Sequence, residues 1–115
     1  MQNYLVLLHE GPTARPVMSP EEIQAVIARY KAWGQRLHES GRLIGSNKLE
    51  DATGRVLRRD DGQIRITDGP FTETKDVLGG YFLIQAESYD EAAELCRDTP
   101  HLDFGVVEVR RIEVV

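Results

Sequence analysis

Two continuous apolar runs, one near the start of the chain and one past its middle, predict strands buried on both faces. They cover residues 4–8 and 80–86. Each has the length of a strand, and an apolar run without polar alternation is typical of a central strand. A further strand is predicted at 105–109, where apolar and charged residues alternate. The alternation changes phase after Arg110, which predicts a bulge or a strand end near Arg111.

Apolar residues at helical spacing predict a first helix that begins after Ser19 and ends at Gly41. Ser19 can cap this helix, and Glu22 three residues later completes a capping box. The residues that share its apolar face are Ile23, Val26, Ile27, Tyr30 and Leu37, with Trp33 and Gly34 beside them. A second capping box at residues 88–91 predicts a short helix from Tyr89 to about Arg97.

Residues 55–58 and 63–67 predict the two strands of a hairpin, since Asp60-Asp61-Gly62 between them is a turn signal. A small extra extended segment is expected at 43–48. The predicted order is β-α-β-β-α-β in a single domain over residues 1–115. The fold class is therefore α+β and ferredoxin-like, with one antiparallel sheet and both helices on one face. Two helices cannot cover both faces of the sheet, so we expect a homodimer that packs sheet against sheet.

Composition and charge narrow the class of protein. The chain has 115 residues, 41% of them hydrophobic and 29% charged, and a net charge of -5. Acids and bases are interspersed, which argues against nucleic acid as a partner. No apolar run approaches the length of a membrane span, and nothing resembles a signal peptide. With Cys96 as the single cysteine, expected to be buried, we predict a soluble cytoplasmic protein.

The stretch from Asp68 to Tyr81 is the chain's main candidate for chemistry, because it is longer and more varied than a plain connection requires. In one interpretation Asp68 or Glu73 is an acid–base group and Lys75 balances the charge of a small-molecule ligand. The walls of that ligand site would be Phe71, Trp33 and Tyr81. In the other interpretation the stretch is structural or lies in a dimer interface, since Asp-Gly-Pro is sufficiently explained as a turn.

The three histidines give weaker signals. His9 ends the first strand, where it could serve as a base in a pocket or simply close the strand end. His38 lies in the polar last turn of the first helix and is expected to face solvent, and His101 follows the second helix. The histidines lack the spacing of a metal site, so we expect no metal. The common nucleotide-binding and nucleophile motifs are also missing from the sequence, so no cofactor is expected.

The motif resembles the signature of a known family. Asp68-Gly69-Pro70-Phe71, with Glu73-Thr74-Lys75 and Leu78-Gly79-Gly80-Tyr81, is similar to the YCII-related family in its DGPF-motif branch. The likeness extends to the opening strand, to the segments at 19–22 and 40–43, and to the ending at 105–110. It implies a ferredoxin-like fold of the dimeric α/β-barrel type, which agrees with the prediction from the pattern.

The resemblance implies less about activity. Most members of the branch are uncharacterised bacterial proteins, and some are associated with extracytoplasmic-function sigma factors. Shorter relatives are proposed to use a histidine–aspartate dyad with the histidine on the first helix, and one related enzyme removes chloride from a chlorinated aromatic. This chain has no histidine between Ser19 and Leu37, so the dyad does not carry over.

Two functions from different classes therefore remain open. The first is a small enzyme-like or ligand-binding domain of lyase or isomerase type, with a pocket near the motif. The second is a non-catalytic regulatory or interaction module, with a sigma factor as a possible partner.

Overall fold

The computed structural model describes residues 1–11, 17–69 and 76–115. Within these ranges the elements follow one another as β1 (Gln2–Glu10), α1 (Pro20–Glu39), β2 (Leu43–Lys48), β3 (Arg55–Asp60), β4 (Gln63–Asp68), β5 (Val77–Ala86), α2 (Tyr89–Leu95), the 3-10 turn η1 (Pro100–Asp103) and β6 (Gly105–Arg111). The strand end predicted near Arg111 is confirmed, and α2 stops two residues before the predicted Arg97.

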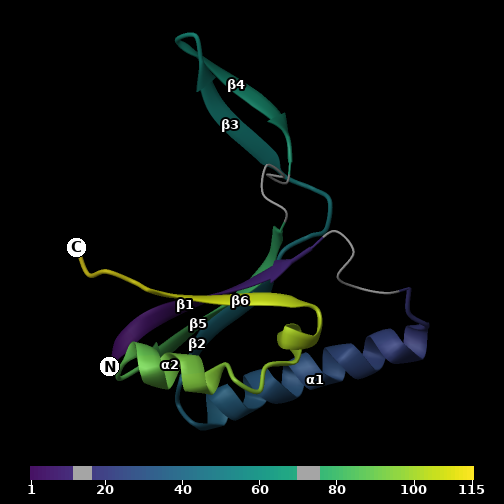
Figure 1. Ribbon diagram of the computed structural model, residues 1–115, viewed down its shortest axis with the longest axis vertical. Helices are drawn as coiled ribbons and strands as arrows, with labels where there is room; N and C mark the ends of the chain where they lie inside the picture. Colours follow the sequence, from purple (N-terminus) through teal and green to yellow (C-terminus); the bar gives the residue numbers. More distant parts are fainter. Residues whose placement is uncertain (12–16, 70–75) are drawn as a thin grey trace.

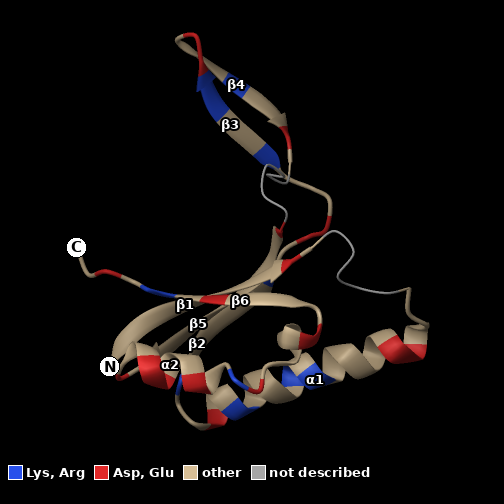
Figure 2. Cartoon of the chain, in the orientation of Figure 1, with Lys and Arg blue, Asp and Glu red and all other residues tan. Residues whose placement is uncertain are grey.

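A four-stranded antiparallel sheet in the order β2-β5-β1-β6 forms the body of the protein. Figure 1 shows α1 and α2 together on one side of this sheet. The α+β class, the antiparallel sheet and its ferredoxin-like order are thus as predicted. Acidic and basic side chains are mixed over the helices and the hairpin (Figure 2). Among the described residues, no helix is long and apolar enough to span a bilayer.

The roles of two segments differ from the prediction. Residues 43–48, expected as a small extra piece, are β2, and they form one edge of the sheet by pairing with β5. The predicted hairpin exists, but β3 and β4 pair only with each other in a separate two-stranded sheet. Figure 1 shows this hairpin standing away from the main sheet on the side opposite the helices. The hairpin is therefore an insertion between the second and third strands of the ferredoxin-like order.

The core lies between the helices and the facing side of the sheet. Alternate residues of β1, namely Tyr4, Val6 and Leu8, are buried there, because successive side chains of a strand point to opposite faces. The buried residues that complete this core are Ile84 and Ala86 of β5, Trp33 and Leu37 of α1, and Ala92 and Cys96 near α2.

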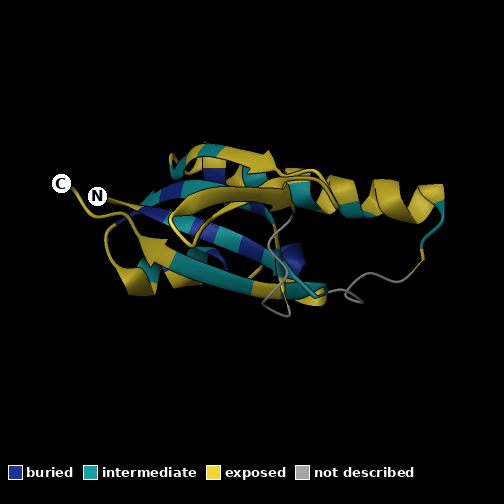
Figure 3. Cartoon of the chain, turned by 90° about the horizontal axis from the view of Figure 1, so that it is seen from above, coloured by how far each residue is buried: buried dark blue, intermediate teal, exposed yellow. Residues whose placement is uncertain are grey.

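The other side of the sheet, which we call the open face, is not covered by the helices. Leu5 and Leu7 of β1 point to this face and are half-buried in the single chain, where the sequence predicted that a second subunit would cover them. Their partners across the ladder are Leu83 and Tyr81 of β5, both half-buried as well. Figure 3 looks down on the molecule from the hairpin side and shows these intermediate positions between the buried ones. The open face is a surface that the helices do not reach, and on β6 it carries Glu108 and Arg110 opposite Leu7 and Leu5.

Both ends of α1 are set by local chemistry. Ser19 Oγ accepts a hydrogen bond from the Glu22 amide at 3.2 Å, and Glu22 Oε1 accepts one from the Ser19 amide, so the predicted capping box is confirmed. At the other end Gly41 has φ of 74°, a left-handed conformation that glycine adopts without steric cost. The amides of Gly41 and Arg42 bond back to the carbonyls of His38 and Leu37, which is a Schellman ending.

Candidate functional site

A cavity of about 740 Å³ lies between α1 and the helix-facing side of the sheet, and we call it the helix-side cavity. Its apolar wall is made by Leu8, Val26, Ile27, Leu43 and Phe82. Its polar wall is made by Glu10, Tyr30, Lys31, Lys48 and His101. A largely apolar cleft with a few converging polar groups is the usual form of a small-molecule site.

Tyr30 and His101 form a hydrogen-bonded pair in the wall of this cavity. The Tyr30 hydroxyl lies 2.9 Å from Nδ1 of His101, and Nε2 of His101 lies 2.8 Å from the carbonyl oxygen of His9. A carbonyl can only accept, so Nε2 carries the proton. In the neutral imidazole Nδ1 then accepts from the Tyr30 hydroxyl. The fixed tautomer points one basic nitrogen at a tyrosine that reaches the cavity.

The turn η1 holds the imidazole in this position. His101 is 1% exposed, and the Thr99 hydroxyl accepts a hydrogen bond from the His101 amide. Gly105 begins β6 directly after this turn, and a Cβ atom there would overlap the carbonyl oxygen of His9 and lie 3.1 Å from Nε2 of His101. Glycine is therefore required at 105 for β6 to approach β1 while the His101–His9 hydrogen bond is kept.

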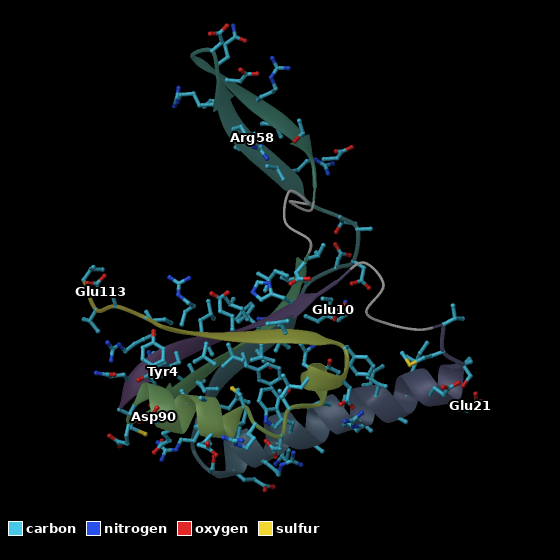
Figure 4. All side chains as sticks on the ribbon, in the orientation of Figure 1. Tyr4, Glu10, Glu21, Arg58, Asp90 and Glu113 are labelled. Carbon is cyan, nitrogen blue, oxygen red and sulfur yellow. The ribbon has the colours of Figure 1, made fainter. Side chains whose placement is uncertain are left out.

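Charged groups of both signs surround the cavity. Glu10 lies at the end of β1, where Figure 4 labels it, and Lys31 comes from α1. Lys48 at the end of β2 donates to the carbonyl of Leu49 and to Asp51 Oδ1, at 2.9 and 3.1 Å. The cavity is thus lined by apolar residues together with two lysines and a glutamate.

His9 has a second environment on the other side of the sheet. Its Nε2 lies 3.0 Å from Oε1 of Glu108, and both side chains are partly exposed. The pairing of β1 with β6 is regular here, with Leu7 opposite Glu108 and His9 opposite Val106, so His9 points to the same face as Leu7. The His9 side chain thus lies with Glu108 on the open face, whereas its carbonyl serves His101 on the helix side.

The structure distributes the remaining predicted site residues among separate places. Asp68 ends β4 in the exposed hairpin and pairs with Arg55 at 3.3 Å. Trp33 is 1% exposed in the core, where its indole donates to the carbonyl of Leu95 and its ring packs on Phe82. The Tyr81 hydroxyl accepts from the Asn47 side chain at 2.9 Å. None of these three lines the helix-side cavity.

The other predicted residues, Phe71, Glu73 and Lys75, lie outside the described residues. In the part of the chain that is described, no cluster of three or more histidine, cysteine, aspartate or glutamate side chains is placed to hold a metal ion. Cys96 is a free, buried thiol, and burial, with a smaller contribution from the charge of Asp98, raises its pKa to about 11. It is a packing residue with little thiolate at neutral pH.

Tyr30 and His101 are not among the residues predicted for a site. Tyr30 lies on the apolar face expected of the first helix, and His101 follows the second helix. The available signal was weak: a histidine directly after Thr99-Pro100 and shortly before Gly105.

Comparisons with known proteins identify the family. Residues 2–115 match the YCII-related domain. An uncharacterized protein from Rhizobium meliloti (strain 1021) is 34% identical over 110 residues, which cover 93% of this chain and 89% of that protein. Among solved structures, the 5-chloro-2-hydroxyhydroquinone dehydrochlorinase from Burkholderia phenoliruptrix AC1100, in complex with 2,5-dihydroxybenzoquinone, has a similar fold. Its TM-score is 0.50 at 19% identity, over 96% of this chain and 93% of that one. The chain therefore belongs to the YCII-related family.

Proposed function

We propose that this chain is a small enzyme-like domain that binds a ring-bearing small molecule in the helix-side cavity and exchanges a proton with it through Tyr30 and His101. The observation that carries this proposal is the buried His101 imidazole, held between the Tyr30 hydroxyl and the His9 carbonyl at the wall of a cavity of about 740 Å³. A purely structural histidine would not need a partner that opens onto a ligand-sized space.

One proton moves from the ligand through Tyr30 to His101, and the charges balance. A ligand hydroxyl or acidic C–H donates its proton to the oxygen of Tyr30, and Tyr30 passes its own proton to Nδ1 of His101. The ligand becomes an anion and the imidazole becomes a cation, and the reverse transfer restores both. Lys31 lies in the same wall and stabilises the ligand anion electrostatically. Proton removal followed by return at another atom is the chemistry of isomerases and lyases.

The ligand class follows from the walls. Phe82 offers an aromatic surface, with Leu8 and Ile27 as further apolar contacts, and the cations suit a ring that carries an ionisable oxygen. The solved relative was crystallised with 2,5-dihydroxybenzoquinone, which has these properties and is a suitable probe.

The test is a titration of the protein with 2,5-dihydroxybenzoquinone, followed by amide chemical shifts. We expect shifts at the cavity residues of α1 and β5, and at least about tenfold weaker binding for Tyr30→Phe, which removes one hydroxyl and keeps the ring. Tyr89→Phe removes a hydroxyl that accepts from the Arg111 amide outside the cavity lining and is the matched control. Shifts confined to the open face, or equal affinity of Tyr30→Phe and wild type, would contradict the proposal.

We also propose that the protein is a homodimer of the dimeric α/β-barrel type, in which two open faces pack together. The support is the half-buried Leu5, Leu7 and Leu83 on that face, together with Val106, which is 56% exposed. These apolar side chains lie beside Glu108 and Arg110 of β6, and apolar positions bordered by polar ones are typical of an interface. Sedimentation of the wild type at falling concentration measures the dimer, and a monomer at micromolar concentration would exclude it.

A further inference from the structure

We infer that the hairpin of β3 and β4, residues 55–68, is an arm that docks on a second copy of this chain. The inference rests on the proposed homodimer and adds to it a second contact area that the sheet does not supply. Four features of the molecule support it. The arm pairs with no other strand of the described residues, and it exposes large apolar side chains. The chain as a whole exposes more surface than a compact monomer, and the arm projects on the side of the open face.

The arm is a two-stranded sheet without a third strand. β3 pairs with β4 from Arg55 opposite Asp68 to Asp60 opposite Gln63, and neither strand pairs with the main sheet. A two-stranded hairpin alone in water is marginally stable at best, and natural ones pack on a helix or another sheet. Figure 1 shows the arm projecting away from both the helices and the sheet. No third strand pairs with it among residues 1–11, 17–69 and 76–115, so the arm needs a covering surface from elsewhere.

The large apolar side chains of the arm gather on one of its two sides. Leu57 lies directly opposite Ile66, so their side chains share a face, and Ile64 two residues along β4 lies on the same face, opposite Arg59. Leu57 and Ile66 are each 62% exposed and Ile64 is 54% exposed. The opposite side carries Arg58 facing Arg65. The three large aliphatic side chains thus lie together at the middle of one side, with charged residues at its ends, which is the pattern of an interface with an apolar centre and a polar rim.

The whole chain exposes more surface than a compact monomer of its mass. Its accessible area is 8241 Å², whereas a folded monomer of 13.0 kDa exposes roughly 6,300 Å². The radius of gyration is 16.2 Å, against about 13 Å for a compact domain of this length. The excess area is close to what one subunit of an obligate homodimer buries, roughly 1,000–2,500 Å². The shape is that of a subunit whose missing contacts belong to another copy.

The geometry favours a second copy over any other partner. The arm stands on the side of the open face, so a copy packed on that face lies beside the arm (Figure 1). In a twofold dimer each arm meets the partner in the same way, and the contact closes on itself. The charges of the arm and of the rest of the chain are complementary. The arm holds four arginines and three aspartates and is net positive. The whole chain has a net charge of -5, so the remainder of the partner subunit is negative.

The experiment compares the dimerisation of two variants of the arm, in each of which threonine replaces apolar side chains. Leu57→Thr with Ile66→Thr removes two of the three aliphatic side chains from that side, and Val56→Thr on the opposite side is the control. Threonine keeps the strand preference, so the hairpin can still form. Sedimentation velocity over a dilution series gives the dimer dissociation constant. We expect at least about 30-fold weaker dimerisation for the double variant and less than about threefold change for the control.

A second measurement needs no variant. Hydrogen exchange of the arm amides in wild-type protein slows with rising protein concentration if the arm docks in the dimer, and is independent of concentration if it does not. A wild-type dimer with an unaffected double variant and concentration-independent exchange would overturn the arm and leave the sheet-to-sheet dimer standing. A monomeric wild type would overturn both and leave the ligand proposal untouched.

Discussion

Gly105→Ala tests whether the approach of β6 to β1 holds the candidate site together. The added Cβ would overlap the carbonyl oxygen of His9 and crowd Nε2 of His101 at 3.1 Å. Forcing the two strands apart costs about 1–3 kcal/mol by analogy with overpacked cores. Stretching the His101–His9 hydrogen bond leaves a buried N–H without a partner, which costs about 1–3 kcal/mol more. We expect a total loss of about 2–6 kcal/mol, a large part of the stability of a domain of this size.

The assay is urea unfolding followed by the fluorescence of Trp33, the only tryptophan, which is 1% exposed and becomes solvated on unfolding. Gly45→Ala in β2 is the matched control, because a Cβ there meets nothing within 4 Å. We expect the control to change stability by less than about 1 kcal/mol. If the unfolding midpoint and slope of Gly105→Ala match those of Gly45→Ala, the close approach of β6 to β1 does not require glycine at 105. The claim that this approach holds His101 in place would then be wrong.

Two further predictions concern a thiol and a helix end. The raised pKa of Cys96 means that the folded state holds the thiol proton more tightly than the unfolded chain. The protonated thiol therefore contributes to the free energy of unfolding. This contribution is complete below about pH 9 and is lost as the pH rises towards about 11. Wild type should therefore lose roughly 2–3 kcal/mol more stability than Cys96→Ala across that range, measured by urea unfolding, and parallel curves would contradict this. Ser19→Ala removes the cap of α1 and should lower amide-exchange protection in its first turns by about 1 kcal/mol, whereas Ser19→Asp, which can still cap, should retain it.

Elements with local signals could be predicted from the sequence. The start of α1 was visible because Ser19 and Glu22 cap each other within four residues. The hairpin was visible because Asp61 and Gly62 both adopt positive φ, 54° and 81°, as the tight turns that join paired strands require. Which strands share a sheet was not visible in the same way. β2 looked like an accessory segment because its place at the sheet edge depends on pairing with β5, a partner far along the chain.

The candidate site was harder to predict because it too depends on contacts between segments that lie far apart in the chain. Tyr30 and His101 are 71 positions apart, and each has an ordinary local explanation, as a residue on an apolar helix face and as part of a turn. Only the packing of η1 against α1 brings the hydroxyl and the imidazole together. The motif from Asp68 onward drew attention because its chemistry is concentrated in a short stretch. The described part of that stretch is the exposed end of the hairpin and the strand that follows.

His9 shows how the two sides of the sheet are connected. Its carbonyl accepts from His101 on the helix side, and its side chain pairs with Glu108 on the open face. Regular alternation along β1 turns the imidazole to the open face, and the backbone carbonyl of the same residue accepts from His101. The cavity pair depends on the backbone of His9 and not on its imidazole, while a partner packed on the open face would contact the imidazole. The two proposals therefore meet at one strand position and use different atoms of it, so substitutions of the side chain and displacement of the backbone probe them separately.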